Sequence, residues 1–594
     1  MWSPLGTGDE FPVFVWCQDH AGSELPAPLL EAFGGVNIEG ADSAHWALEH
    51  EVEFYVGHAP GREVLHLARE VPWYDAMWNE FYKTRDTSTL VRQPCLSSPS
   101  TWTATLATLD KTLAAREGQH GQALSLGDEV GLTPWGDPLD LCQSKSCTQR
   151  WNEWCLTQDV QLSEKGWPST DEVRLRYLDG ETDTVHVWLA RRRFHQEVVS
   201  DFLRKLANHV RRRAPKVRIA LFGLTGQTAF GGVSIPRMLP TLDVLEAYNE
   251  GCARELLYTL RDEQASWCTV FPAKGDSDRG AHRLWEHWLR GGDGAIIWSD
   301  RKLKENPRYL ERLAETVSAI RAVRASFPDW RPQTAGVALL HDDDSTALAW
   351  LRDALSDGPT WPRRFAGYQT EHGTRELAVN SSLRLFEDCG LLPGALPLDQ
   401  LDAAHATRFP LLVAVHQLVV TRDNEARLAA YLKAGGKLLL RGPFALLGDR
   451  ADEDCKAAEA RLTKRFPKSV VRLEADASGE FDYNASRVEQ SDGRVAAMRA
   501  QCTALLNETR EWRLTSTPSV PLLIAQQRMA DGSLLCAVIP NLPTGPLASL
   551  ELQLSTKREV ERIFPTDDQP QSHSQVRLAA GDAYVFVLRE RQAR

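Results

Sequence analysis

The chain has 594 residues, which is too long for one hydrophobic core and predicts about three domains. Its composition, 43% hydrophobic and 25% charged, is that of a globular protein. The net charge of -12 argues against a nucleic-acid partner, because such proteins need a basic face to displace counterions.

No apolar run reaches the ~18 residues that a membrane-spanning helix needs, so no membrane partner is expected. The N-terminal MWSPLGTGDEF lacks a basic segment followed by an apolar stretch, so it does not resemble a signal peptide. The location stays open: it is cytoplasmic, or periplasmic or secreted if a signal peptide has been removed. The arginine clusters 191–193 and 211–213 lie in helical patterns and are interpreted as solvated helix faces.

The first part of the chain alternates short apolar runs with helical patterns. Eight strands are expected, and most of them are followed by a helix; they are marked by Val13, Val36, Phe54, Leu124, Ile219, Val244, Cys268 and Ile296. Alternation of strand and helix over about 300 residues predicts parallel strands, and eight such units predict a TIM (β/α)8 barrel over residues 1–330.

Two further domains are expected after the barrel. Residues 331–510 repeat a strand-helix-strand pattern and predict a smaller doubly wound α/β domain, without the glycine-rich fingerprint of a nucleotide site. Residues 511–594 alternate apolar and polar side chains, as in the pair of strands around the Asp531–Gly532 turn, and predict a C-terminal all-β, sandwich-like domain.

Polar residues follow the apolar barrel strands, where barrels of this type place their chemistry. The run A-L-S-L ends in the adjacent carboxylates Asp128 and Glu129. Other strand ends offer further candidates: Glu39, Tyr248, Glu250, Asp276 and Asp300.

The 19 tryptophans favour carbohydrate contact, because an indole ring stacks well on the apolar face of a sugar, although core packing explains most of them. The candidates beside strand ends are Trp16, Trp135, Trp267 and Trp298. No cofactor is expected. The eleven cysteines are expected to be mostly reduced thiols, and the spacing of Cys142, Cys147 and Cys155 fits a zinc site poorly, so no metal is predicted.

The order of domains, the segment FPLLVAVHQLVVTRDNEARLAAYLKAGGKLLLRGPF, and LGDE followed by RWNEWCL resemble the β-galactosidases of glycoside hydrolase family 42. The resemblance implies a flavodoxin-like middle domain that supports a homotrimer, and a β-galactosidase-like hydrolase acting on a plant or algal saccharide. It assigns the general acid/base to Glu129, and Tyr248 matches a tyrosine that orients the nucleophile.

Two positions depart from the family pattern. Asp128 stands where the family has asparagine, so an amide that can donate to a sugar hydroxyl is replaced by a carboxylate that only accepts when ionised. The seventh strand, ASWCTVFPAKGD, has no glutamate at the position of the nucleophile; Val270 and Phe271 stand there.

Glycoside hydrolysis generally needs a second carboxyl group. Glu250 and Asp276 are the first candidates for that catalytic role, and Glu39 and Asp300 could also supply it. The substrate-binding set is Asp128, Trp16, Glu39, Trp135, Tyr248, Trp298 and Asp300. Two other functions stay open: a catalytically silent carbohydrate-binding barrel, and an enzyme of different chemistry on the same fold.

Overall fold

The computed structural model describes residues 11–17, 32–38, 47, 52–67, 71–115, 121–158, 160, 167–226, 228–272, 276–332, 334, 336–364, 366, 373–448, 457–487, 492–506, 512–542, 549–565 and 575–589.

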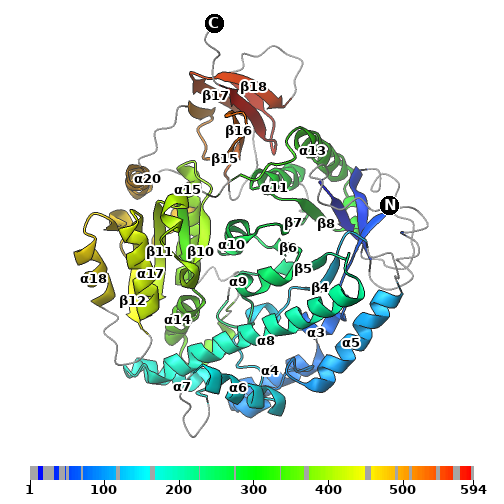
Figure 1. Cartoon of the computed structure of the whole chain (residues 1–594), viewed down its shortest axis with the longest axis vertical. Helices are drawn as coiled ribbons and strands as arrows, with labels where there is room; N and C mark the ends of the chain where they lie inside the picture. The colour runs from blue at the N-terminus through cyan, green and yellow to red at the C-terminus, as the bar shows by residue number, and fades with distance from the viewer. Residues whose placement is uncertain are drawn as a thin grey trace.

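The first part of the chain forms a closed barrel of eight parallel strands, of which β4 to β8 are labelled in Figure 1. The strands are β1 (Val13–Trp16), β2 (Gly34–Ile38), β3 (Glu53–Val56), β4 (Leu124–Asp128), β5 (Ile219–Leu224), β6 (Val244–Ala247), β7 (Ala265–Val270) and β8 (Gly294–Trp298). Each is apolar and nearly all of their residues are buried, as expected for strands covered on both faces. All eight strands expected from the sequence are confirmed, and β1 pairs with β8 to close the barrel.

Helices surround the barrel and connect its strands. They include α3 (Arg62–Leu65), α4 (Pro72–Thr84), α5 (Pro99–Ala114), α6 (Lys145–Thr157), α7 (Thr170–Leu178), α8 (Asp183–Arg213), α9 (Ile235–Met238), α10 (Ala253–Leu260), α11 (Ser277–Leu289), α12 (Asp300–Lys304) and α13 (Pro307–Ser326). Among the described residues, no helix is long and apolar enough to cross a membrane.

Helix α8 corrects one expectation from the sequence. Arg191 and Arg192 are 1% and 5% exposed, so they do not lie on a solvated face as expected. Arg192 pairs with the buried carboxylate of Asp140 at 2.6 Å, and the Arg191 guanidinium lies 3.9 Å from the centre of the Trp167 ring. A buried arginine is tolerated when such partners replace water.

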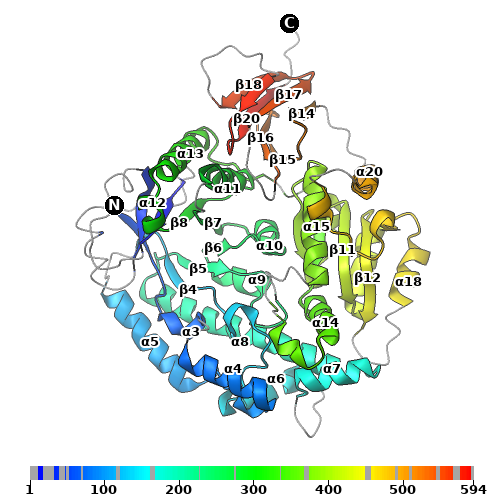
Figure 2. The ribbon, with the colours of Figure 1, turned by 180° about the vertical axis from the view of Figure 1, so that it is seen from behind.

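A second, parallel sheet follows the barrel, in the order β10-β9-β11-β12-β13. Its strands are β9 (Val337–His341), β10 (Gly394–Pro397), β11 (Leu411–Val419), β12 (Lys437–Leu447) and β13 (Val470–Arg472), with helices α14 (Asp343–Ala354), α15 (Thr374–Asp388), α17 (Arg422–Lys433), α18 (Ala458–Arg465) and α20 (Gly493–Leu506). This strand order is that of the flavodoxin-like fold. The second sheet lies beside the barrel in both views (Figures 1 and 2). The two are joined by a hydrogen bond from the Ala395 N–H on β10 to the Thr259 hydroxyl on α10, at 3.0 Å.

The last strands form two antiparallel sheets, β14-β17-β19 and β15-β16-β20-β18, which lie next to α11 and α13 (Figure 2). They are β14 (Trp512–Thr517), β15 (Leu522–Arg528), β16 (Leu534–Pro540), β17 (Leu550–Thr556), β18 (Glu559–Phe564), β19 (Gln575–Leu578) and β20 (Tyr584–Arg589). The expected all-β character of this region is confirmed, including the hairpin between β15 and β16.

Candidate active site

The carboxyl end of β4 carries the adjacent Asp128 and Glu129. Between the pairs Ser125–Ala220 and Asp128–Phe222, β4 has one more residue than β5, so the strand bulges immediately before the two carboxylates. A bulge of this kind redirects the side chains that follow it. Glu129 also has a left-handed backbone (φ 48), which is uncommon for a residue with a Cβ and is typical of functional sites.

Gly223 on β5 makes room for this pair. A Cβ at position 223 would lie 2.1 Å from Asp128 Oδ1 and 2.8 Å from Glu129 Cγ, and its φ of +59 favours glycine. The position therefore accepts no side chain without displacing the carboxylates.

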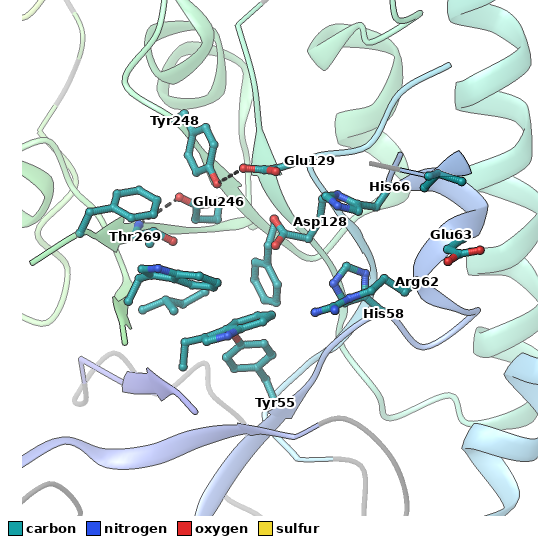
Figure 3. A pocket seen from close by; sticks show the side chains of 16 residues that line it. Tyr55, His58, Arg62, Glu63, His66, Asp128, Glu129, Glu246, Tyr248 and Thr269 are labelled. Carbon is teal, nitrogen blue, oxygen red and sulfur yellow. Dashed lines mark hydrogen bonds between the residues drawn. The ribbon is translucent and has the colours of Figure 1, made fainter. Parts of the chain in front are cut away.

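Glu129 has the properties of a general acid. Burial, and next the negative charge of Asp128, raise the pKa of Glu129 to about 7. The Tyr248 hydroxyl donates a hydrogen bond to Glu129 Oε1 at 2.8 Å (Figure 3). A carboxylic acid that keeps its proton near neutral pH can donate it to a leaving group.

Glu246 on β6 is a carboxyl group that the sequence analysis did not select. It is 2% exposed, and its two oxygens accept backbone N–H groups on both sides, from Gly223 at 2.5 Å and Thr269 at 3.0 Å. Burial, and next the charge of Asp128, raise the pKa of Glu246 to about 8. A single charged residue inside the apolar run V-L-E-A was the signal that could have found it.

The end of β7 differs from the end of β4. The strand ends in Thr269 and Val270, and the next residue is Phe271, which is 48% exposed and lines a cavity at the barrel mouth. The aromatic ring of Phe271 lies 6.0 Å from that of Tyr248 and 6.5 Å from that of Trp298. Apolar and hydroxyl groups thus occupy the place that the resemblance assigns to a nucleophilic carboxylate.

The barrel mouth encloses a cavity of about 500 Å3, within the ~300–1,000 Å3 typical of small-molecule sites. Asp128, Glu129 and Glu246 converge on it (Figure 3). Aromatic rings supply much of the wall, and the Trp16 and Trp298 rings lie 4.8 Å apart. The lining is Trp16, Tyr55, His58, Arg62, Glu63, His66, Val71, Asp128, Glu129, Phe222, Glu246, Tyr248, Thr269, Phe271, Ile296 and Trp298.

One side of the cavity carries basic groups. Burial, and next the Arg62 charge, lower the pKa of His58 to about 3, so this imidazole is neutral at pH 7. His66 Nδ1 lies 2.9 Å from the backbone oxygen of Asp128 and helps to fix the end of β4.

An adjoining cavity of about 370 Å3 shares Glu129, Glu246 and Tyr248 with the first. It is lined in addition by Glu250 and Trp135, so the structure places both of these candidates beside the site. Glu250 Oε2 accepts the Gly226 N–H at 3.3 Å.

Asp276 and Asp300, two further candidates from the sequence, lie away from both cavities. Asp276 caps α11 by accepting the Arg279 N–H at 3.0 Å, and Asp300 is buried at the start of α12 beside Lys304 Nζ at 3.0 Å. Neither residue lines the two cavities. Glu39 lies outside the described residues.

The cysteines form a local thiol cluster. Cys142 accepts the backbone N–H groups of Arg92 and Ser144, each at 3.4 Å, and its close thiol neighbours are Cys147 and Cys95. The sequence suggested a group of Cys142, Cys147 and Cys155, but the third thiol beside Cys142 and Cys147 is Cys95. Among the described residues, no cluster of three or more potential ligands is arranged to hold a metal ion.

No family model matches the sequence, and no curated protein is significantly similar to it. Solved structures do match. A β-galactosidase from Bacillus circulans sp. alkalophilus superimposes with a TM-score of 0.67 at 9% identity, over 98% of this chain and 99% of that one.

Two further matches are described as family 42 enzymes. Gan42B, a β-galactosidase from G. stearothermophilus, gives a TM-score of 0.65 at 12% identity, over 98% of each chain. An exo-carrageenase from Bacteroides ovatus gives 0.62 at 10% identity, over 98% of this chain and 82% of that one. Over nearly its whole length, this chain has the fold of the glycoside hydrolase family 42 β-galactosidases, as the resemblance in sequence predicted.

Proposed function

We propose that the protein is a glycoside hydrolase that uses Glu129 as its general acid/base. The observation that carries this proposal is the position of Glu129 in the barrel-mouth cavity, with a pKa raised to about 7 and a hydrogen bond from Tyr248. Protonation of a glycosidic oxygen needs an acid of this kind. The structural neighbours, which include β-galactosidases, a carrageenase and an α-L-fucosidase, support a saccharide as substrate.

The aromatic wall supports the same proposal. Trp16 and Trp298 line the cavity with their rings 4.8 Å apart, and an indole ring of this kind would stack on the apolar face of a sugar ring. Trp135 would extend this contact in the adjoining cavity. The β-galactoside expected from the resemblance, from a plant or algal saccharide, is the first substrate to test.

The experiment is a panel of aryl glycosides assayed with the wild type and with Glu129→Gln. Turnover of at least one glycoside by the wild type, with a large loss in the variant, is expected. No turnover of any sugar, or equal turnover by the variant, would overturn the proposal.

The second candidate is a carbohydrate-binding barrel without catalysis, which the apolar end of β7 favours. Calorimetric titration with oligosaccharides separates it from the first: binding of a saccharide that the protein never hydrolyses would support the silent barrel. The homotrimer implied by the resemblance stays a prediction, which light scattering coupled to size-exclusion chromatography can check.

A further inference from the structure

We propose that the cavity hydrolyses β-linked 2-acetamido-2-deoxyhexosides, with the acetamide oxygen of the substrate as the nucleophile and Asp128 as the group that holds the acetamide N–H. This inference rests on the proposed function, because it uses Glu129 as the general acid/base. It replaces the galactoside expected from the resemblance with a substrate that supplies what the end of β7 lacks.

Among the residues that the structure describes, the end of β7 provides no carboxylate that could act as a nucleophile. The end of β7 offers only Thr269, Val270 and Phe271. Glu250 lines the adjoining cavity, and Glu63 is exposed on α3. Glu246 is buried in the cavity, but both of its oxygens accept backbone N–H groups of the neighbouring strands. Its raised pKa keeps it neutral at pH 7, and a neutral carboxyl group is a poor nucleophile.

A minority of glycoside hydrolases avoid this requirement, because a group of the substrate attacks the anomeric carbon. A 2-acetamido group can do so, since its carbonyl oxygen reaches C1 through a five-membered ring. The enzyme then needs only an acid/base and a group that orients the acetamide and stabilises the positive charge that develops on it.

Asp128 has the chemistry needed to orient the acetamide and to stabilise the positive charge on it. An ionised carboxylate only accepts hydrogen bonds, so it suits the acetamide N–H, and its negative charge stabilises an oxazolinium ion. It directly precedes Glu129 on the chain, after the bulge in β4, and the two side chains face the same cavity (Figure 3).

The wall around Asp128 suits the remainder of an acetamide. The rings of Tyr55 and Phe222 lie 4.9 Å apart and line the same cavity as Asp128, as do Trp16 and Trp298. Such a surface can bury the methyl group of the acetamide. Gly223 leaves the space that Asp128 occupies.

The reaction balances in two steps. The acetamide oxygen bonds to C1 while the bond from C1 to the leaving oxygen breaks, and the Glu129 proton moves to that oxygen; the products are the free alcohol and an oxazolinium ion whose N–H is held by Asp128. Water then bonds to C1 and gives its proton to Glu129, the C1 bond to the acetamide oxygen breaks, and the amide is restored.

This chemistry also sets the stereochemistry. The acetamide oxygen must approach C1 from the face opposite the leaving group, so the two substituents must be trans. In the gluco and galacto series this condition selects the β-anomer. Two successive inversions give net retention at C1.

The main test compares aryl β-N-acetylglucosaminide and β-N-acetylgalactosaminide with the matching β-glucoside, β-galactoside and β-glucosaminide that has a free amine. We expect kcat/KM for at least one N-acetyl substrate to exceed that of its 2-hydroxy and 2-amino counterparts by about 100-fold. The thiazoline analogue of the oxazolinium ion should inhibit competitively. Better turnover of a 2-hydroxy glycoside would overturn this inference and sustain the proposed function, whereas no turnover of any glycoside would overturn both.

Two further measurements distinguish substrate assistance from simple preference for an acetamide. Successive fluorination of the acetyl methyl makes the carbonyl oxygen less nucleophilic, so kcat should fall at each step; a flat series would contradict the mechanism. A 2-deoxy-2-fluoro glycosyl fluoride should form no covalent adduct, and an adduct on Glu246 would identify a protein nucleophile.

The role of Asp128 is tested with the variant Asp128→Asn, which introduces the asparagine of the family pattern. Turnover of the N-acetyl substrate should fall by about 100-fold or more, because the charge that stabilises the oxazolinium ion is lost. Asp75→Asn, an exposed position on α4, is the matched control and should keep wild-type turnover. If Asp128→Asn instead improves turnover of a β-galactoside and leaves the N-acetyl substrate unaffected, the inference fails.

Discussion

The ends of β4 and β7 face one cavity but carry opposite chemistry. The end of β4 has two adjacent carboxylates, set by a bulge, by the space at Gly223 and by the hydroxyl of Tyr248. The end of β7 has a hydroxyl, a buried valine and a half-exposed phenylalanine. The end of β4 thus carries the proposed proton donor, while the end of β7 has no carboxylate at the position that the resemblance assigns to the nucleophile.

Tyr248 contacts the end of β4 through its hydroxyl. The resemblance assigns it to orientation of a nucleophile, but in this structure its hydroxyl donates to Glu129. This hydrogen bond joins Tyr248, which follows β6, to Glu129, which follows β4. Substitutions at the end of β4 and around it measure how far the function depends on this strand end.

The largest effect is expected for Glu129→Gln. An amide cannot donate a proton to the leaving oxygen, so kcat should fall by about 100- to 10,000-fold for substrates with poor leaving groups. The loss should be small for a dinitrophenyl glycoside, which needs no protonation. Glu311→Gln on α13, an exposed position, is the control, and an equal loss for all leaving groups would contradict the role of Glu129 as acid.

Gly223→Ala should disturb both carboxylates. The new Cβ would lie 2.1 Å from Asp128 Oδ1, and the left-handed φ adds about 1–2 kcal/mol of strain. We expect turnover to fall by at least about 10-fold and the free energy of unfolding by at least about 2 kcal/mol. Gly251→Ala is a matched control, because its φ is +55 but nothing lies within 4 Å of the Cβ position; it reports the strain without the collision.

Glu246→Gln should reduce stability by about 1–3 kcal/mol in urea unfolding. One of the two oxygens that accept the Gly223 and Thr269 N–H groups becomes a donor, which leaves a buried N–H without an acceptor.

The cost of this substitution should depend on pH. The pKa of Glu246 rises from 4.5 to about 8 on folding, so between these pH values the native state holds a proton that the unfolded chain releases. The contribution of Glu246 to the free energy of unfolding of the wild type therefore falls as the pH increases from 4.5 to 8. Glutamine has no such dependence, so the cost measured at pH 5 should exceed that at pH 8. A cost that increases with pH would show that Glu246 is ionised in the folded protein.

The smallest effect is a shift of the pH profile in Asp128→Asn. Glu129 must be protonated to act, so activity is present below its pKa of about 7 and lost above it. Removal of the Asp128 charge lowers that pKa, while burial still holds it above its ordinary value of 4.5. The basic limb of kcat/KM should therefore move to lower pH; a limb that stays in place would assign it to another group.

Much of this architecture could be predicted from the sequence. Apolar runs followed by helices gave the eight barrel strands, and the DE pair at the end of L-S-L-G gave Glu129, because both signals are local in the chain. Glu246 was missed because its partners, Gly223 and Thr269, are distant in sequence and meet only in the closed barrel. Glu250 and Asp276 were selected by their nearness to a strand end, but Asp276 proves to cap a helix.

The sequence by itself determined which segments form strands and helices, and it placed an acidic pair where β4 ends, because hydrophobic periodicity and adjacency in the chain need no tertiary contact. Only the tertiary structure decided which carboxyl groups hold protons near neutral pH. Burial of Glu129 and Glu246, with the Asp128 charge nearby, raises both pKa values. Desolvation and charge proximity arise only when β4, β5, β6 and β7 come together around one cavity.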